Sequence, residues 1–195
     1  MLDERFVLVG VAISFLGSFT YFLATLKGKV QPNRVSYFIW SMAPFIAAAA
    51  ELSQGVGLLA LTTFMAGFNP FMILLASFVN KKAQWKLSRF DLICGAFSLV
   101  GLLLWAITET PNIAILFALF SEIFAALPTL VKAYRFPQSE LPWGYLAGSL
   151  NAGIGLLTIQ VWNFEHVAFP AYIFLISGLL FGVTYLRRAT TSSSF

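Results

Sequence analysis

The stretch Thr25–Asn33, TLKGKVQPN, decides the fold, because a second stretch about a hundred residues later repeats its plan. The later stretch is Thr129–Gln138, TLVKAYRFPQ. Each follows a long apolar segment, opens on Thr-Leu, carries two cations and closes on a proline followed by an amide residue. We therefore predict an internal duplication, with the functional site between its two halves.

The composition of the chain is typical of a membrane protein. Of its 195 residues, 59% are apolar and 10% are charged, and the mean hydropathy is +0.83, whereas a soluble domain is usually about 25% charged. The apolar runs are continuous rather than alternating, which favours helices over a barrel. We predict an all-α integral membrane protein that lies in a lipid bilayer.

Seven apolar segments are long enough to predict seven transmembrane helices. In chain order they are Phe6–Leu26, Val35–Ala50, Gly55–Val79, Leu92–Thr108, Asn112–Val131, Trp143–Trp162 and Val167–Leu186. Small residues recur at a spacing of four in several of them, as at Gly10, Ser14 and Ser18. This spacing lets helix backbones approach closely and indicates a tight bundle.

The duplication divides these segments into two three-helix bundles with one helix left over. We predict a first bundle over residues 1–90, a linker helix over 91–110, a second bundle over 111–188 and a disordered tail over 189–195. An odd connecting helix makes the two bundles parallel, in a 3+1+3 arrangement. Pro70 and Pro170 lie at equivalent points of the third and seventh segments and support the repeat.

The charges predict how the chain is oriented. Of the 12 Lys and Arg residues, all except Arg5 fall at segment ends that this arrangement puts on one side. Lysine and arginine collect on the cytoplasmic side of membrane proteins. We predict an outside N-terminus and a cytoplasmic C-terminus, in the plasma (inner) membrane. The cations form no single soluble face, so we do not expect a nucleic-acid partner.

Glu122 is the one formal charge well inside a predicted span. A charge at the bilayer centre costs at least ~2.5–3.5 kcal/mol on insertion scales, so such a residue faces the bundle interior. Three roles stay open: a proton-coupling carboxyl group, a partner for a cationic or polyhydroxyl substrate, and a protonated structural hydrogen bond between helices.

Two asparagines are further candidates for binding a solute. Asn69 precedes Pro70, which breaks the helical hydrogen-bond ladder and frees a carbonyl near Ala66. Broken helices mark binding sites in transporters. Asn151 lies in the glycine-rich stretch SLNAGIG, where a ligand or another backbone can come close. For both residues the alternative is a hydrogen bond that only holds neighbouring helices together.

Trp40 and Tyr172 are the aromatic candidates, since either could stack on a solute or anchor a helix at the membrane interface. Cys94 is the single cysteine, which excludes an intrachain disulfide and a cysteine metal site. His166 lies alone in a predicted outside loop. Nucleotide-binding and catalytic motifs are absent, so we expect no cofactor, no metal and no enzymatic activity.

Three helices, a linker helix and three more helices, with the turns Pro32-Asn33 and Pro137-Gln138, resemble the PQ-loop superfamily. Within it the chain is most similar to SWEET-type (MtN3/saliva) transporters, over residues 10–186. The resemblance implies alternating-access transport of a small polar solute, with a sugar as the first expectation. The hinges that the resemblance and the repeat together predict are Pro44, Pro70, Pro128 and Pro170.

Two rival functions stay open. On the same fold, the solute could be an amino acid or a nucleoside-like vitamin, as in the related PnuC-type transporters, with proton coupling through Glu122. From another class, the chain could be a sorting receptor or assembly factor that does not transport, because receptors of the KDEL type share this architecture. A homo-oligomer is compatible with either.

Overall fold

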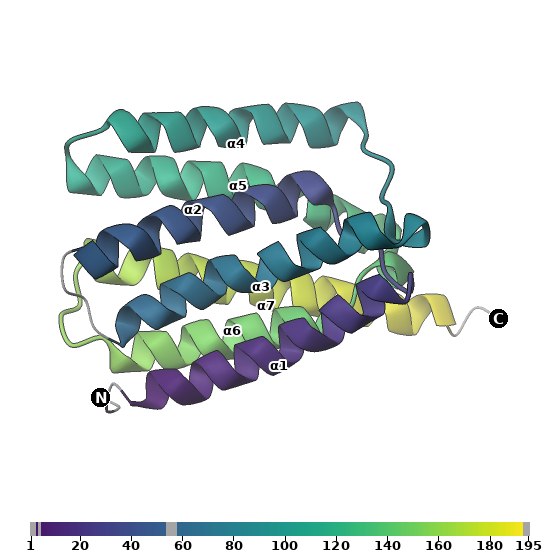
Figure 1. Cartoon of the computed structure of the whole chain (residues 1–195), viewed down its shortest axis with the longest axis horizontal. Coiled ribbons are helices and arrows are strands. Elements are labelled where there is room, and N and C mark those ends of the chain that lie inside the picture. Colours follow the sequence, from purple (N-terminus) through teal and green to yellow (C-terminus); the bar gives the residue numbers. More distant parts are fainter. Residues whose placement is uncertain (1–2, 4, 54–57, 193–195) are drawn as a thin grey trace.

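The structure is a computed structural model that describes residues 3, 5–53 and 58–192. These residues form seven α-helices and two short 3-10 helices, with no strand among them (Figure 1). The elements are α1 Phe6–Leu26, α2 Arg34–Ser53, α3 Leu59–Val79, η1 Lys81–Ala83, α4 Arg89–Ile107, α5 Pro111–Arg135, η2 Pro137–Ser139, α6 Pro142–Thr158 and α7 Phe164–Ser192. The prediction of an all-helical chain is confirmed.

Local sequence explains several helix ends. At the start of α4, the Ser88 hydroxyl accepts from the Asp91 amide and the Asp91 carboxylate accepts from the Ser88 amide. The helix α6 ends before the predicted Trp162, where the Gln160 side chain donates to the Thr158 carbonyl oxygen. The helix α7 continues to Ser192, through residues predicted as a disordered tail. The predicted start of the third span, Gly55, and residues 193–195 lie outside the described residues.

Five of the described helices are long and apolar enough to cross a membrane: α1, α3, α4, α5 and α7. By length and composition the structure thus supports five of the seven predicted spans. Their apolar side chains largely face outward, and in the most apolar window of α7 only 11% of the residues are buried. An apolar surface of this kind suits contact with lipid chains, which is the membrane environment that the composition predicts.

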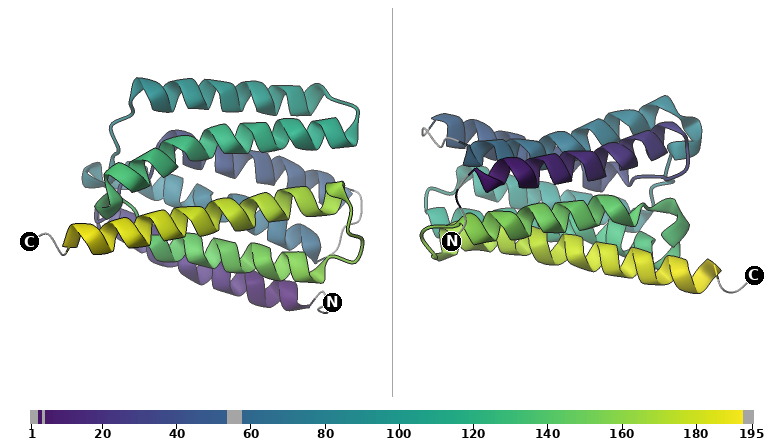
Figure 2. Two further views of the ribbon diagram at one scale, coloured as in Figure 1. Left: turned by 180° about the vertical axis from the view of Figure 1, so that it is seen from behind. Right: turned by 90° about the horizontal axis from the view of Figure 1, so that it is seen from below.

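Six helices close a ring. The helix α1 packs against α3 and α6, α2 packs against α3 and α5, and α7 packs against α5 and α6. The order around the ring is therefore α1, α3, α2, α5, α7, α6. The remaining helix, α4, lies outside the ring and contacts α5 and α2 (Figures 1 and 2).

Small residues let α1 and α6 approach closely. A Cβ atom added to Gly17 would lie 2.2 Å from the Cβ atom of Ala147, so no larger residue fits at Gly17 without moving a helix. Gly10, Ser14 and Ser18 are buried on α1, as their spacing predicts. This contact joins the first helix of the chain to the sixth and helps to close the ring.

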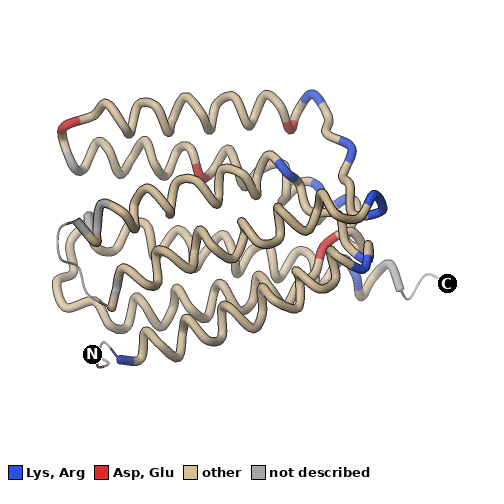
Figure 3. Tube along the Cα trace, viewed as in Figure 1, with Lys and Arg blue, Asp and Glu red and all other residues tan. Residues whose placement is uncertain are grey.

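Lysine and arginine gather at one end of the bundle, where α1, α3, α5 and α7 end (Figure 3). We call it the basic end; Arg5, the N-cap of α1, lies at the opposite end, where α1 begins. A buried cluster of apolar and tyrosine side chains lies near the basic end. Its members are Tyr21, Val30, Tyr37, Ile73, Leu74, Ala133, Tyr145 and Leu180.

Candidate solute-binding cavity

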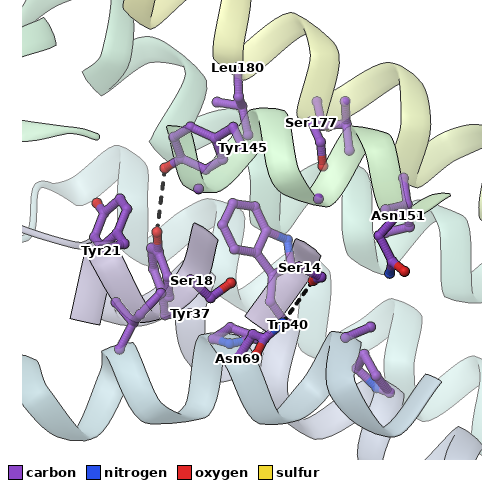
Figure 4. A pocket seen from close by; sticks show the side chains of 18 of the residues that line it. Ser14, Ser18, Tyr21, Tyr37, Trp40, Asn69, Tyr145, Asn151, Ser177 and Leu180 are labelled. Atoms are coloured by element: carbon purple, nitrogen blue, oxygen red, sulfur yellow. Dashed lines mark hydrogen bonds between the residues drawn. The ribbon is translucent and has the colours of Figure 1, made fainter. Parts of the chain in front are cut away.

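A cavity of about 140 Å³ lies inside the ring (Figure 4). All six ring helices contribute side chains to its wall, whereas α4 contributes none. The polar and aromatic side chains that line it are Ser14, Ser18, Tyr21, Tyr37, Trp40, Asn69, Glu122, Tyr145, Asn151 and Ser177. The cavity wall is therefore mainly apolar and aromatic, with a few polar groups among the apolar ones.

Four of the five side chains predicted to bind a solute line this one cavity: Trp40, Asn69, Glu122 and Asn151. They come from α2, α3, α5 and α6, which are far apart in the sequence. The fifth, Tyr172 of α7, is not among the lining residues, and its hydroxyl is buried without a hydrogen-bond partner in the described structure.

The four predicted hinge prolines all lie inside helices, and two of them reach the cavity. Pro44 of α2 and Pro70 of α3 line it, whereas Pro128 of α5 and Pro170 of α7 do not. A proline has no N–H to donate to the carbonyl four residues earlier. For Pro70 that carbonyl belongs to Ala66, which also lines the cavity. The hinge role itself stays a prediction.

The two asparagines differ in how they are held. The Asn69 side-chain nitrogen donates to the Ser14 hydroxyl of α1 at 2.8 Å, while its side-chain oxygen is buried without a partner. Asn151 of α6 lies against α1, where a Cβ atom added to Gly10 would come 2.6 Å from its side-chain oxygen. Asn69 thus joins two helices and still offers one acceptor atom to the cavity.

Glu122 lies near the middle of α5 and is only 2% exposed. Its Oε1 atom has no hydrogen-bond partner in the described structure. The residues that line the cavity with it include no lysine, arginine or histidine. The interior position predicted for this carboxyl group is confirmed, and none of the described residues that line the cavity puts a cation beside it.

Between the cavity and the basic end, five buried polar side chains form one hydrogen-bonded cluster. We call Tyr21, Tyr37, Lys132, Glu140 and Tyr145 the tyrosine–glutamate cluster. The Glu140 carboxylate accepts from the hydroxyls of Tyr21 at 2.5 Å and Tyr145 at 2.6 Å, and it pairs with Lys132 Nζ at 2.5 Å. The Tyr37 and Tyr145 hydroxyls lie 3.4 Å apart. The three tyrosines also line the cavity, so this cluster forms part of its wall.

Sequence reasoning missed Lys132 and Glu140 as partners. Lys132 was assigned to the cations that set orientation, although its ammonium group donates to the Gln31 carbonyl oxygen and lies 4.9 Å from the centre of the Trp85 ring. One signal could have found the site. Glu140 and Asp91 are the two acidic residues whose positions fall at the cation-rich end, and both prove to be buried.

The two proline–amide turns lie side by side and have different environments. The Gln31 backbone N–H donates to the Ser139 carbonyl oxygen at 2.9 Å, which joins them. Pro32 and Asn33 are fully buried, and the Asn33 amide donates to the Asp91 carboxylate at 2.9 Å. Pro137 is buried as well, but Gln138 is exposed and accepts from Arg188 at 3.2 Å.

Comparison of the chain with protein-family models, with curated proteins and with solved structures gives no match.

Proposed function

We propose that the chain is an alternating-access transporter of a small polar solute, built as a PQ-loop protein of the SWEET type. Two features of the helix packing support the 3+1+3 arrangement. The order α1, α3, α2 in the first half of the ring corresponds to the order α5, α7, α6 in the second half. The linker α4 stands outside both halves, as a helix that only connects two repeats would.

The observation that carries the proposal is the cavity between the halves, whose wall holds buried polar atoms without a partner. Buried polar groups are normally paired, because an unpaired one costs free energy. A solute that pairs with them in passing explains why the chain keeps Glu122 and Asn69 inside an apolar bundle. The broken ladder at Pro70 adds a free carbonyl in the same wall, as in the binding sites of other transporters.

Alternating access requires an end of the cavity that closes and opens. At the basic end the halves meet through polar contacts, Tyr21 with Glu140 and the Gln31 backbone with that of Ser139. Such contacts can be exchanged for contacts with water when the halves separate. The described prolines of α2, α3, α5 and α7 would absorb the accompanying bend.

The proposed orientation puts the basic end in the cytoplasm and the N-terminus outside, because cations collect on the cytoplasmic side. All seven helices then cross the membrane, which we propose to be the plasma (inner) membrane. The resemblance to SWEET proteins makes sugars the first solutes to test. Amino acids and nucleoside-like vitamins follow, with Glu122 as the proton-coupling group if uptake depends on a proton gradient.

The test is uptake by the purified full chain reconstituted into liposomes, with labelled sugars, amino acids, nucleosides and small amines supplied outside. We expect uptake of one class above that of protein-free liposomes. Ser177→Phe, which fills the cavity wall, should abolish it, whereas Leu179→Phe on the exposed face of the same helix should not. Binding of a solute or peptide without uptake would contradict transport and favour a receptor.

A further inference from the structure

Two buried oxygen atoms in the cavity wall lack a donor. Glu122 is 2% exposed and Asn69 is 4% exposed, and neither Glu122 Oε1 nor Asn69 Oδ1 has a hydrogen-bond partner in the described structure. Both residues line the same cavity. An amide oxygen and an ionised carboxylate only accept hydrogen bonds, so the ligand that completes them must donate.

An ionised Glu122 would also lack a counter-charge among the residues that line the cavity. Among the described residues that line the cavity there is no lysine, arginine or histidine. The buried Lys132 is held in the tyrosine–glutamate cluster by Glu140 and by the Gln31 carbonyl oxygen. A buried charge is normally paired or bound to a cation, because an isolated one is costly in a low dielectric. A neutral polyol could donate to these oxygens but would leave the charge unbalanced.

An aromatic part of the wall comes from α2, which lies between α3 and α5 in the ring. Tyr37 and Trp40 both line it and pack edge to face, with ring centres 5.3 Å apart and planes at 64° (Figure 4). The face of an indole ring attracts a cation that approaches within about 6 Å of its centre. An aromatic wall on the helix next to a lone carboxylate is therefore suited to a positively charged organic group, and far less to an anion.

From these observations we infer that the cavity binds a small organic cation, an ammonium compound whose charge pairs with Glu122. Its donors, where it has them, meet Glu122 and Asn69, and its carbon atoms lie against Trp40. The volume of about 140 Å³ sets the size, since an apolar cavity of roughly 150 Å³ takes a ligand as large as benzene. The inferred cation would be the solute of the proposed transporter. That it is transported rests on the proposed function, whereas its binding to the cavity does not.

The test compares cations with uncharged compounds of the same shape. Choline is paired with 3,3-dimethyl-1-butanol and n-butylamine with n-butanol, and D-glucose represents the neutral polyols. Their affinities for the purified full chain in detergent are measured by calorimetry. We expect at least one cation to bind about tenfold or more tightly than its neutral counterpart, as loss of a buried charge pair requires.

Charge variants assign the effect to one residue. Glu122→Gln should weaken binding of that cation by about tenfold or more, and Glu122→Asp should keep the preference for cations. Glu109→Gln makes the same substitution at an exposed position between α4 and α5 and should change nothing. If Glu122→Gln does not fold, the cation–isostere comparison and Glu122→Asp still decide.

Several outcomes would overturn the inference: no binding by any cation, equal binding of the neutral counterparts, tighter binding of D-glucose, or full affinity in a folded Glu122→Gln. Uptake into liposomes separates this inference from the proposed function. Cations that bind without being taken up would support the cation site and contradict transport. Uptake of D-glucose without cation binding would support transport and contradict the cation site.

Discussion

Lys132 at the end of α5 and Glu140 before α6 form an ion pair of 2.5 Å, with side chains no more than 1% exposed. The two residues flank the turn that contains Pro137-Gln138. A buried ion pair repays its desolvation only where further hydrogen bonds satisfy both groups. Here the Tyr21 and Tyr145 hydroxyls donate to the carboxylate, and the Gln31 carbonyl accepts from the ammonium group.

Removing Glu140 should destabilise the chain more than removing Lys132. Glu140→Gln leaves the Lys132 charge buried and unbalanced, and we expect a loss of about 3–5 kcal/mol. Lys132→Met leaves Glu140 with its two tyrosine donors and should cost less. Thermal unfolding of the purified chain in detergent measures both, together with the double variant. A larger loss for Lys132→Met than for Glu140→Gln would contradict this account.

The Tyr21 hydroxyl should help to keep the basic end closed, because it joins α1 to Glu140 in the other half. We place a cysteine in the cavity wall with Ser18→Cys, in a Cys94→Ala background, and label it with an impermeant maleimide from the basic side. Tyr21→Phe should speed labelling several-fold. Tyr185→Phe, a tyrosine change on an exposed surface of α7, should leave the rate unchanged; equal rates in both variants would show that the hydroxyl does not hold the end closed.

Two glycines should respond oppositely to one added methyl group. Gly17→Ala puts a Cβ atom 2.2 Å from that of Ala147, and overpacking of this kind costs roughly 1–3 kcal/mol. In the part of the chain that the structure describes, no atom comes within 4 Å of a Cβ atom added to Gly182. Gly182→Ala should therefore be neutral or stabilise α7 by up to about 1 kcal/mol, since alanine favours the helix. Equal stabilities in thermal unfolding would mean that α1 and α6 are not in close contact.

The amide residues of the two turns should differ in their importance for stability. Asn33 is buried, accepts from the Val35 amide at 3.1 Å and donates to Asp91. Asn33→Ala removes a helix cap and a buried hydrogen bond, which we expect to cost about 1–2 kcal/mol. Gln138→Ala changes an exposed side chain and should stay within ~0.5 kcal/mol. The reverse order of stabilities would contradict the contacts seen at these turns.

Much of the cavity could be predicted, because polar residues inside apolar helices are rare and turn inward. That argument found Glu122, the proline break and the glycine-rich stretch pointed to Asn69 and Asn151, and Trp40 was chosen for its aromatic ring. All four line the cavity. The ends of α1 could also be predicted, because charged residues flank its apolar segment. The predicted bounds Phe6–Leu26 agree with the structure. The position of Tyr172 in a span does not say which face of α7 it occupies, so the sequence could not show that it lies outside the cavity lining.

The tyrosine–glutamate cluster could not be predicted in the same way. Lys132 and Glu140 lie near segment ends, where charged residues are expected for reasons of orientation alone. Their burial depends on how the turns of the two halves pack together. The periodicity of residues along a single helix contains no information on that packing. The predicted ends of α6 and α7 differ from the structure because they were taken from the apolar segments alone. The end of α6 depends on local hydrogen bonds, and α7 continues past its apolar segment.

The hydrogen bond from the Gln31 amide to the Ser139 carbonyl oxygen joins two backbones. The bond does not involve the side chain at either position, so both residues can be substituted while the bond is kept. One replacement is forbidden: proline at position 31, which has no N–H to donate. Substitutions at positions 31 and 139 other than this one can therefore keep the backbone link, even where they lose a side-chain contact such as that of Gln31 with the Lys82 carbonyl oxygen.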